Sequence, residues 1–437
     1  MQVIENIKQK IKGLSGDNKS VLTLVGGTTI AQGLSFLFSP ITTRLFSPEV
    51  FGDLSVFTSI TSIVSVIVCL RYELAIILPQ DDDEGFALLK LSYIFAALVS
   101  TVTGMVFLLC GKTLYYKFGA RDLAGYWYYV PICLFLTGII QASNYWLTRT
   151  RQFKVLSLNK IVPVVVLNLV SIGLGLAGYR DIRVWLFSLI ASYIANVAIF
   201  SKTILREFEP KKHISKYRFT ELIKKYKNFL VYDVWGALIN NLSWAIVPIL
   251  MNSFFSANAA GQYSICMKVI HVPSSVIGAS ILQVFLKTAS EKKYKGTLYP
   301  YCKETAKKLM KYTLPIVVLL FLFGKEVFHI LFGSKWEVAG IYTQILMPWA
   351  LVWFISSPLT VVFTICQKQN KFLIIAIFNL VTSLVSLYAG KLLNSDIWGM
   401  IFFSITGLIL YTVSLFLAFR EAKKSDEAYS EINKICR

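Results

Sequence analysis

Apolar stretches close to twenty residues long recur along almost the whole chain, from Val21 to Phe419. A helix needs about 20 such residues to cross the hydrocarbon core of a membrane. Only 16% of the 437 residues are charged, whereas a soluble domain usually carries about 25%. The pattern therefore predicts a helical protein that crosses a membrane many times, and it excludes a soluble multidomain protein.

Charge clusters and turn residues divide the chain into twelve candidate spans. They cover approximately residues 20–45, 50–78, 86–110, 125–147, 157–178, 183–203, 228–253, 259–287, 308–331, 339–365, 372–392 and 397–419. We expect an N-lobe of six spans within 1–205, a basic linker over 206–227, a C-lobe of six spans within 228–419, and a tail over 420–437.

The chain is strongly basic, with 44 Lys and Arg against 24 Asp and Glu. The basic residues form short clusters between the spans, and most lie on one side of the membrane if both chain ends lie there too. Because positive loops stay in the cytoplasm, we expect both ends of the chain to be cytoplasmic. The same rule explains the excess of basic residues, so we expect no nucleic acid as a partner. The acidic run from Asp81 to Glu84 is an exception on this side, but acidic residues contribute little to orientation.

The two halves of the chain are similar to each other. Residues 34–40 (LSFLFSP) match 242–248 (LSWAIVP), and 46–55 (FSPEVFGDLS) match 255–264 (FSANAAGQYS). Chance similarity between apolar helices is the alternative, although matched Pro, Gly and Ser are harder to obtain by chance. The repeat predicts an all-α polytopic membrane protein, with about twelve transmembrane helices in two pseudo-symmetric six-helix lobes around a central cavity.

Polar residues line one face of the first span: Thr28, Gln32, Ser35, Ser39 and Thr42. Their spacing places them on one side of a helix. They can line a wet cavity together with Asn240 of the seventh span. Close helix packing is the alternative, because small polar residues also let membrane helices approach each other.

The eighth span has a similar stripe that carries charge, formed by Ser264, Lys268, His271 and Ser275. An ionisable group inside the hydrocarbon costs at least about 2.5 kcal/mol and usually faces a bundle interior or an aqueous cavity. We interpret Lys268 and His271 as cavity residues, with a buried structural pair to a carboxylate as the alternative.

Three further charges lie inside spans. Arg71 and Glu73 are two positions apart on the second span, so on a continuous helix they cannot face each other and each needs its own partner. That partner can be a neighbouring helix, a substrate or a proton pathway. Asp233, with Asn240 two turns later, can bind a coupling cation or simply face the interface between helices.

Arg149, Arg151 and Lys154 form a basic cluster at the inner end of the fourth span. Such clusters set topology and contact anionic lipids. The alternative role is recruitment of a phosphate-bearing lipid, because Arg binds phosphate through two parallel hydrogen bonds. Arg44, near the outer end of the first span, is an outer-side counterpart.

Four ordered motifs resemble the O-antigen or polysaccharide flippases of the multidrug/oligosaccharidyl-lipid/polysaccharide (MOP) exporter superfamily. They are Pro40-x-x-x-Arg44-Leu45-x-Ser47-Pro48-x-x-Phe51-Gly52, Leu70-Arg71-Tyr72-Glu73-x-Ala75-Ile76 followed by Leu78-Pro79, Thr148-Arg149-x-Arg151-x-Phe153-Lys154, and Leu331-Phe332-Gly333-x-x-Trp336-x-x-Ala339-Gly340-x-Tyr342. The resemblance covers essentially the whole chain.

The resemblance implies a two-lobed transporter of the bacterial inner membrane, not an enzyme. Its cargo would be an undecaprenyl-diphosphate-linked oligosaccharide, moved from the cytoplasmic to the periplasmic leaflet by alternating access. In the implied mechanism, the head group is attracted by Arg149, Arg151 and Lys154. It is stabilised in the cavity by Lys268, His271 and Arg71. Arg44 receives it on the outer side. Anionic lipids and polysaccharide polymerase machinery would be partners of a monomer.

No GxxxxGK[ST] phosphate-binding loop, metal-ligand spacing or cofactor motif occurs in the sequence. We therefore expect no cofactor and a proton or sodium gradient as the energy source, with Glu73 and Asp233 as coupling candidates. Two alternatives remain. A drug or organic-cation antiporter of the same superfamily would be expected to have a more acidic cavity, and a glycan polymerase or ligase a large outer loop.

Overall fold

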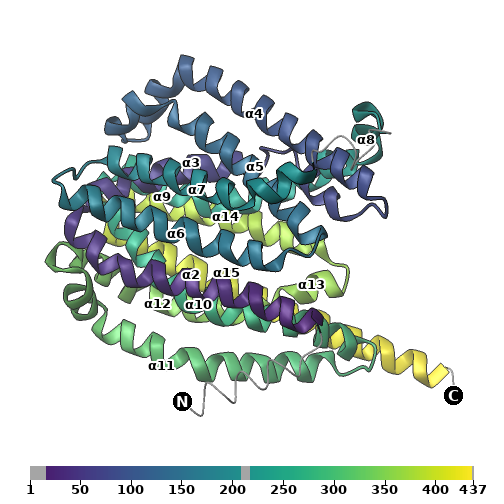
Figure 1. Ribbon diagram of the computed structural model, residues 1–437. Coiled ribbons are helices and arrows are strands. Elements are labelled where there is room, and N and C mark those ends of the chain that lie inside the picture. The colour runs from purple at the N-terminus through teal and green to yellow at the C-terminus, as the bar shows by residue number, and fades with distance from the viewer. Residues whose placement is uncertain (1–15, 208–216, 436–437) are drawn as a thin grey trace, which may run out of the picture.

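The computed structural model describes residues 16–207 and 217–435, and over these ranges the chain is helical without any strand (Figure 1). The helices of the first half are α2 (Gly16–Leu45), α3 (Pro48–Ser65), α4 (Asp82–Lys117), α5 (Tyr129–Arg149), α6 (Phe153–Leu176) and α7 (Ile182–Glu207). A short helix α8 (Phe219–Lys225) follows. The second half contains α9 (Val234–Phe254), α10 (Ala257–Lys293), α11 (Leu298–Phe332), α12 (Glu337–Leu359), α13 (Val361–Ile365), α14 (Gln369–Leu392) and α15 (Asp396–Ile435).

Each predicted span contains one long helix, which confirms the all-α polytopic fold. Within the described ranges, 9 helical segments are long and apolar enough to cross a membrane. The long helices α2, α3 and α10 are not among these 9. These three helices contain many of the glycines, serines and threonines that formed the predicted polar faces. Helix α10 contacts α2, α3 and α9, so these helices lie where the two lobes meet.

The second span differs from the prediction that it runs as one helix over residues 50–78. Helix α3 ends at Ser65, and a short 3-10 helix covers Tyr72–Ile77 after a series of tight turns. Leu70 and Arg71 have φ angles of 50° and 66°. An α-helix cannot continue through this left-handed backbone conformation, so the span is broken on the N-terminal side of Arg71.

The two lobes repeat one packing scheme. In the first lobe α2 packs on α6, α6 on α7, α7 on α5 and α5 on α4. In the second lobe α9 packs on α14, α14 on α15, α15 on α12 and α12 on α11, in the same order. The predicted pseudo-symmetry of two six-helix lobes is therefore present in the structure. The residue boundaries proposed for the lobes stay a prediction.

The lobes meet where α3 and α10 begin, which we call the Gly52 end. A Cβ atom on Gly52 would lie 2.7 Å from the carbonyl carbon of Ala257, and one on Gly261 would lie 2.7 Å from that of Pro48. The matched repeat glycines thus make reciprocal contacts across the pseudo-twofold axis. Asn258 also donates a hydrogen bond to the Glu49 carboxylate at 2.6 Å.

Aromatic side chains reinforce the Gly52 end. The buried Trp336 indole of the second lobe donates to the Thr43 carbonyl of the first at 2.9 Å. Its ring lies 5.2 Å from that of Phe51, nearly perpendicular to it, and Phe51 also contacts Trp185. Perpendicular aromatic contacts of this kind stabilise packing beyond the buried area alone. The lobes are therefore tightly closed at this end.

The opposite end of the bundle, which we call the α8 end, carries α8 and the end of α15 (Figure 1). The segment that joins the lobes is held to the first lobe there, because Lys225 and Tyr226 both bind the buried Glu84 carboxylate, at 2.5 and 2.9 Å. The hydrogen bond to Glu84 raises the pKa of Lys225. Tyr217 binds Asp81 at 2.8 Å. The acidic run at 81–84 therefore has local partners.

Candidate functional site

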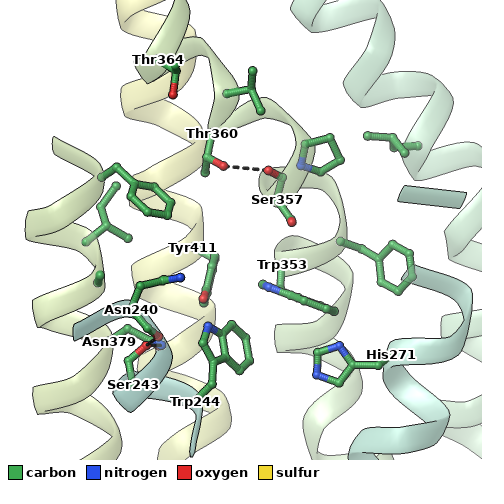
Figure 2. A pocket seen from close by; sticks show the side chains of 17 residues that line it. Asn240, Ser243, Trp244, His271, Trp353, Ser357, Thr360, Thr364, Asn379 and Tyr411 are labelled. Carbon is green, nitrogen blue, oxygen red and sulfur yellow. Dashed lines mark hydrogen bonds between the residues drawn. The ribbon is translucent and has the colours of Figure 1, made fainter. Parts of the chain in front are cut away.

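A cavity of about 650 Å³ lies in the second lobe, among α9, α10, α12, α13, α14 and α15 (Figure 2). Its polar and aromatic lining consists of Asn240, Ser243, Trp244, His271, Trp353, Phe354, Ser357, Thr360, Thr364, Phe372, Asn379 and Tyr411. None of the described residues that line it is Asp or Glu. Its volume lies within the range of about 300–1,000 Å³ that is usual for small-molecule sites.

One wall of the cavity is aromatic. The His271 ring lies 4.9 Å from the Trp353 ring at an interplanar angle of 81°, and 5.9 Å from Trp244. Trp349 stacks behind Trp353 at 5.8 Å with an angle of 16°. Figure 2 shows Trp244, His271 and Trp353 close together on one side. The stack fixes the orientation of Trp353, which is 7% exposed and lines the cavity.

The facing wall carries amides and hydroxyls. Asn379 of α14 donates to the Ser243 hydroxyl of α9 at 3.2 Å, and Ser243 donates to the Asn240 carbonyl at 2.8 Å. Proline cannot donate a helical hydrogen bond, and α12 ends at Leu359, directly after Pro358. This break places Ser357 and Thr360 at the cavity. The wall thus offers several donors and acceptors without a formal charge.

A second hollow of about 490 Å³ leads from this cavity toward the α8 end. It is lined by Asp233 and Asn370, and it shares Asn240, Phe372 and Ala376 with the cavity. Because the two hollows share three lining residues on α9 and α14, they lie next to each other along these helices. A polar molecule entering near Asp233 would reach the aromatic wall by way of Asn240.

An ion cluster connects the lobes at the mouth of this path. The Arg71 Nε atom lies 2.7 Å from the Asp233 carboxylate, and an Arg71 terminal nitrogen lies 3.8 Å from the Glu73 carboxylate. The expectation that Arg71 and Glu73 cannot face each other is therefore wrong. It assumed a continuous helix, whereas the turn at Arg71 brings the two side chains to the same side. Glu73 is buried, and its Oε2 atom makes no described hydrogen bond.

Lys268 and His271 occupy different surroundings. His271 is exposed to the cavity, whereas Lys268 is half-buried one turn earlier on α10 and is not among the lining residues. Among the described residues, Lys268 forms no ion pair with a carboxylate. Ser264 donates to the Gly261 carbonyl of its own helix at 2.8 Å. The predicted stripe member Ser275 lies outside the residues whose side chains are described.

Of the predicted basic cluster, Arg149 is held within the protein. It donates to the carbonyls of Ile76 and Pro79 at 3.0 and 2.7 Å and to the Asp82 carboxylate at 2.8 Å. Its side chain is only 9% exposed. Arg151 and Lys154 are exposed. Arg149 thus ties the end of α5 to the segment that leads into α4, whereas its two neighbours are exposed.

The remaining predicted residues lie on α2. Arg44, exposed near the Gly52 end, donates to the Ile330 carbonyl of α11 at 3.2 Å. Ser39 donates back to the Ser35 carbonyl at 2.8 Å, and Thr28 and Gln32 are partly buried. None of these residues lines the cavity of the second lobe.

Sequence analysis missed most of the cavity residues, including Trp353, Asn379 and Tyr411. One signal was available. Trp349 and Trp353 are four positions apart, which places both on the same helical face, and Ser356-Ser357-Pro358 follows them. Aromatic spacing followed by a proline break indicates a lined opening, but tryptophans in an apolar span are equally expected as core.

The fold defines a class of membrane proteins before any family is considered: multi-pass helical membrane proteins with two similar lobes. It is similar to a multidrug resistance MATE family transporter of the MOP superfamily in its inward-facing conformation, with a TM-score of 0.74 and 15% identity over 91% of this chain and 96% of that one. An outward-facing structure of such a transporter has a TM-score of 0.59 and 13% identity, over 94% of this chain and 96% of that one. A mutant of the Vibrio cholerae MATE transporter VcmN gives 0.60 at 13% identity over 94% and 97%.

The family model described as polysaccharide biosynthesis protein matches residues 41–341. This chain therefore belongs to that family, as predicted, and it shares the fold of the MATE transporters of the MOP superfamily. The chain is also 23% identical over 215 residues to the teichuronic acid biosynthesis protein TuaB of Bacillus subtilis. That similarity spans 48% of this chain and 43% of the relative.

Proposed function

We propose that this protein is a flippase, which moves oligosaccharides linked to undecaprenyl diphosphate across the bacterial cytoplasmic membrane for assembly of a surface polysaccharide. The sugar and diphosphate would travel through the hydrated interior while the lipid tail stays in the bilayer. Membership of the polysaccharide biosynthesis family and the transporter fold both support this proposal. The positive inner loops favour cytoplasmic chain ends.

The composition of the second-lobe cavity is the observation that carries the proposal. Sugars present hydroxyls at their edges and apolar C–H groups on their faces. The indoles of Trp244 and Trp353 offer flat apolar surfaces, and Asn240, Asn379 and Ser243 offer neutral donors and acceptors. This combination suits a polar, uncharged glycan.

Closure at only one end fits alternating access. The reciprocal contacts at Gly52 and Gly261 close one end of the bundle, whereas the path past Asp233 opens toward the other. The higher TM-score with the inward-facing transporter agrees with this geometry. In this account the described state receives cargo at the α8 end, which is cytoplasmic.

A cation gradient would drive the cycle through the cluster of Arg71, Glu73 and Asp233. The buried Glu73 carboxylate and the cross-lobe pair of Arg71 with Asp233 change surroundings if the lobes separate at the α8 end. Binding of a proton or sodium ion to either carboxylate would weaken its attraction to Arg71. Coupling would then act on the contact that links the lobes beside this mouth of the path.

A drug or organic-cation antiporter is the second candidate, because the similar solved structures are multidrug transporters. Recognition of an organic cation in a dry cavity favours a carboxylate. The described lining contains none, and His271 lies in the cavity wall. This lining favours the glycan flippase.

The test replaces Trp353 by Ala and measures export of lipid-linked glycan at matched protein abundance. We expect export to fall about tenfold, corresponding to loss of about 1.4 kcal/mol of binding. The control is Trp398→Ala, because Trp398 is 49% exposed on the outside of α15. Equal export by the two variants would contradict a sugar-binding role for the cavity.

A further inference from the structure

A cleft of about 420 Å³ opens at the α8 end between the end of α10, the start of α14 and the C-terminal part of α15. Its charged lining consists of Lys293, Lys368, Lys371, Lys424 and Glu421. Four ammonium groups therefore surround one carboxylate. Asn370 lines both this cleft and the hollow that leads to the glycan cavity.

The carboxylate in the cleft is already satisfied. Glu421 is buried and binds the Lys371 ammonium at 2.7 Å. Lys293 donates to the Ile365 carbonyl at 2.8 Å. Lys368 and Lys424 are exposed and form no ion pair with any residue that the structure describes. The cleft thus keeps a net positive charge after its internal pairs are counted.

The backbone adds to this positive field. Helix α14 has 24 residues and begins at Gln369, beside the cleft. The first amide groups of a helix have no partner within it, and the helix dipole places partial positive charge at the same end. Phosphate groups bind at such ends when side-chain cations lie nearby.

The pseudo-symmetric site in the first lobe shows how differently the same backbone is used. The loops 150–152 and 366–368 have matching hydrogen bonds, and Arg151 and Gln367 have φ angles of 56° and 57°. In the first lobe, Arg149 lies directly before this loop and pairs with Asp82. The corresponding residue in the second lobe is the apolar Ile365. The two lobes therefore differ here, because the first has an arginine bound to a carboxylate and the second has an apolar residue near a basic cleft.

We propose that the cleft formed by Lys293, Lys368, Lys371 and Lys424 binds the phosphate or diphosphate head group of a lipid. Its connection through Asn370 to the glycan cavity places the diphosphate of the carrier lipid here while the sugars enter the second lobe. This assignment to the carrier rests on the proposed function. The proposal that the cleft binds a phosphate group does not depend on the proposed function.

The test titrates the purified full-length protein with inorganic pyrophosphate at low ionic strength, by calorimetry. The test variant carries Lys368→Gln and Lys424→Gln, both at exposed positions that leave the Lys371–Glu421 pair intact. The control carries Lys308→Gln and Lys423→Gln, which remove the same charge from exposed helical i,i+4 pairs outside the cleft. Thermal unfolding of all three proteins checks that each is folded.

We expect the dissociation constant to rise about thirtyfold in the test variant, because two lysines are removed and each contributes about 1 kcal/mol toward an anionic group near a membrane surface. The control should stay within about twofold of the wild type. Equal affinity of the test variant and the wild type, or failure of the wild type to bind pyrophosphate, would overturn the proposal.

Nanodiscs distinguish the two sources of the phosphate group. Loss of pyrophosphate binding when phosphatidylglycerol replaces phosphatidylcholine would support the site and assign it to bulk anionic phospholipid. Retained binding would support the site and assign it to a diphosphate lipid. Because the titration requires no transport, this proposal and the flippase proposal can fail separately.

Discussion

Gly261→Ala should open the contact that closes the Gly52 end. The added Cβ would lie 2.7 Å from the Pro48 carbonyl carbon and 3.1 Å from the Gly52 nitrogen. Ordinary contacts begin at 3.4 Å, so α3 and α10 must separate by at least about 0.7 Å at this point. The nearest obstacle is the Pro48 carbonyl oxygen, and all three obstacles are backbone atoms, so no side chain can rotate away. Overpacking of this kind costs about 1–3 kcal/mol.

A cost of about 1–3 kcal/mol changes a two-state population ratio by about 5- to 150-fold. The assay is cross-linking of Glu49→Cys to Asn258→Cys by a short bifunctional thiol reagent, because the native side chains contact each other across the lobes. It uses a background in which the seven native cysteines are replaced. We expect the yield at short reaction times to fall at least fivefold with Gly261→Ala.

The matched control is Gly33→Ala on α2, where an added Cβ meets no atom within 4 Å. It should leave the cross-linking yield unchanged. An unchanged yield with Gly261→Ala would refute the argument that reciprocal glycine contacts hold this end closed.

Two other changes separate gating from structural roles. Arg71→Asp should reduce export by breaking the pair with Asp233, and the reversed pair Arg71→Asp with Asp233→Arg should recover part of the export. Because the two side chains are 23% and 46% exposed, we expect the pair to contribute about 1 kcal/mol or less. Arg149→Ala should lower the free energy of unfolding by about 2 kcal/mol, since a charged donor to buried carbonyls is lost, and protein abundance should fall as a result. Lys154→Ala, at an exposed position, should change neither quantity.

These predictions have clear contrary outcomes. No recovery by the reversed pair would show that Arg71 acts through a partner other than Asp233. Normal abundance and normal unfolding of Arg149→Ala, together with lost export, would return Arg149 to the role of a head-group ligand. The Arg71 and Asp233 variants are compared by export at matched abundance. Arg149→Ala is compared with the wild type by a thermal or denaturant unfolding curve.

The sequence was sufficient to predict the helical spans and the repeat. Hydropathy depends on composition over about twenty residues, so it located each long helix. The matched Gly52 and Gly261 also predicted correctly where the halves correspond. Their reciprocal contact could not be predicted, because it depends on how closely α3 approaches α10.

The break at Arg71 was not predictable from hydropathy. The residues before it, Ile67 to Leu70, are apolar and compatible with a continuous helix. The left-handed backbone at Leu70 and Arg71 occurs together with the tertiary contact to Asp233. Long-range contacts of this kind override local pattern, and the error about Arg71 and Glu73 followed from it.

The candidate site was predicted only in part. His271 and Asn240 do line the cavity, but sequence analysis emphasised charged residues because charge is conspicuous in an apolar chain. Trp353 and Asn379 were passed over, since aromatic and amide residues also occur in the cores of membrane helices. The basic cleft around Lys368 was missed because its four lysines come from three separate helices and a connecting loop.

The most direct test of the flippase proposal is mass spectrometry of undecaprenyl-linked glycans, with measurement of surface polysaccharide, in a strain that lacks this gene and after the gene is restored. The account predicts that complete lipid-linked repeat units accumulate on the cytoplasmic side and that surface polymer is lost, both reversed by restoration. Intact polymer without accumulation would contradict it and favour a drug antiporter, and accumulation of single repeat units on the periplasmic side would instead indicate a polymerase.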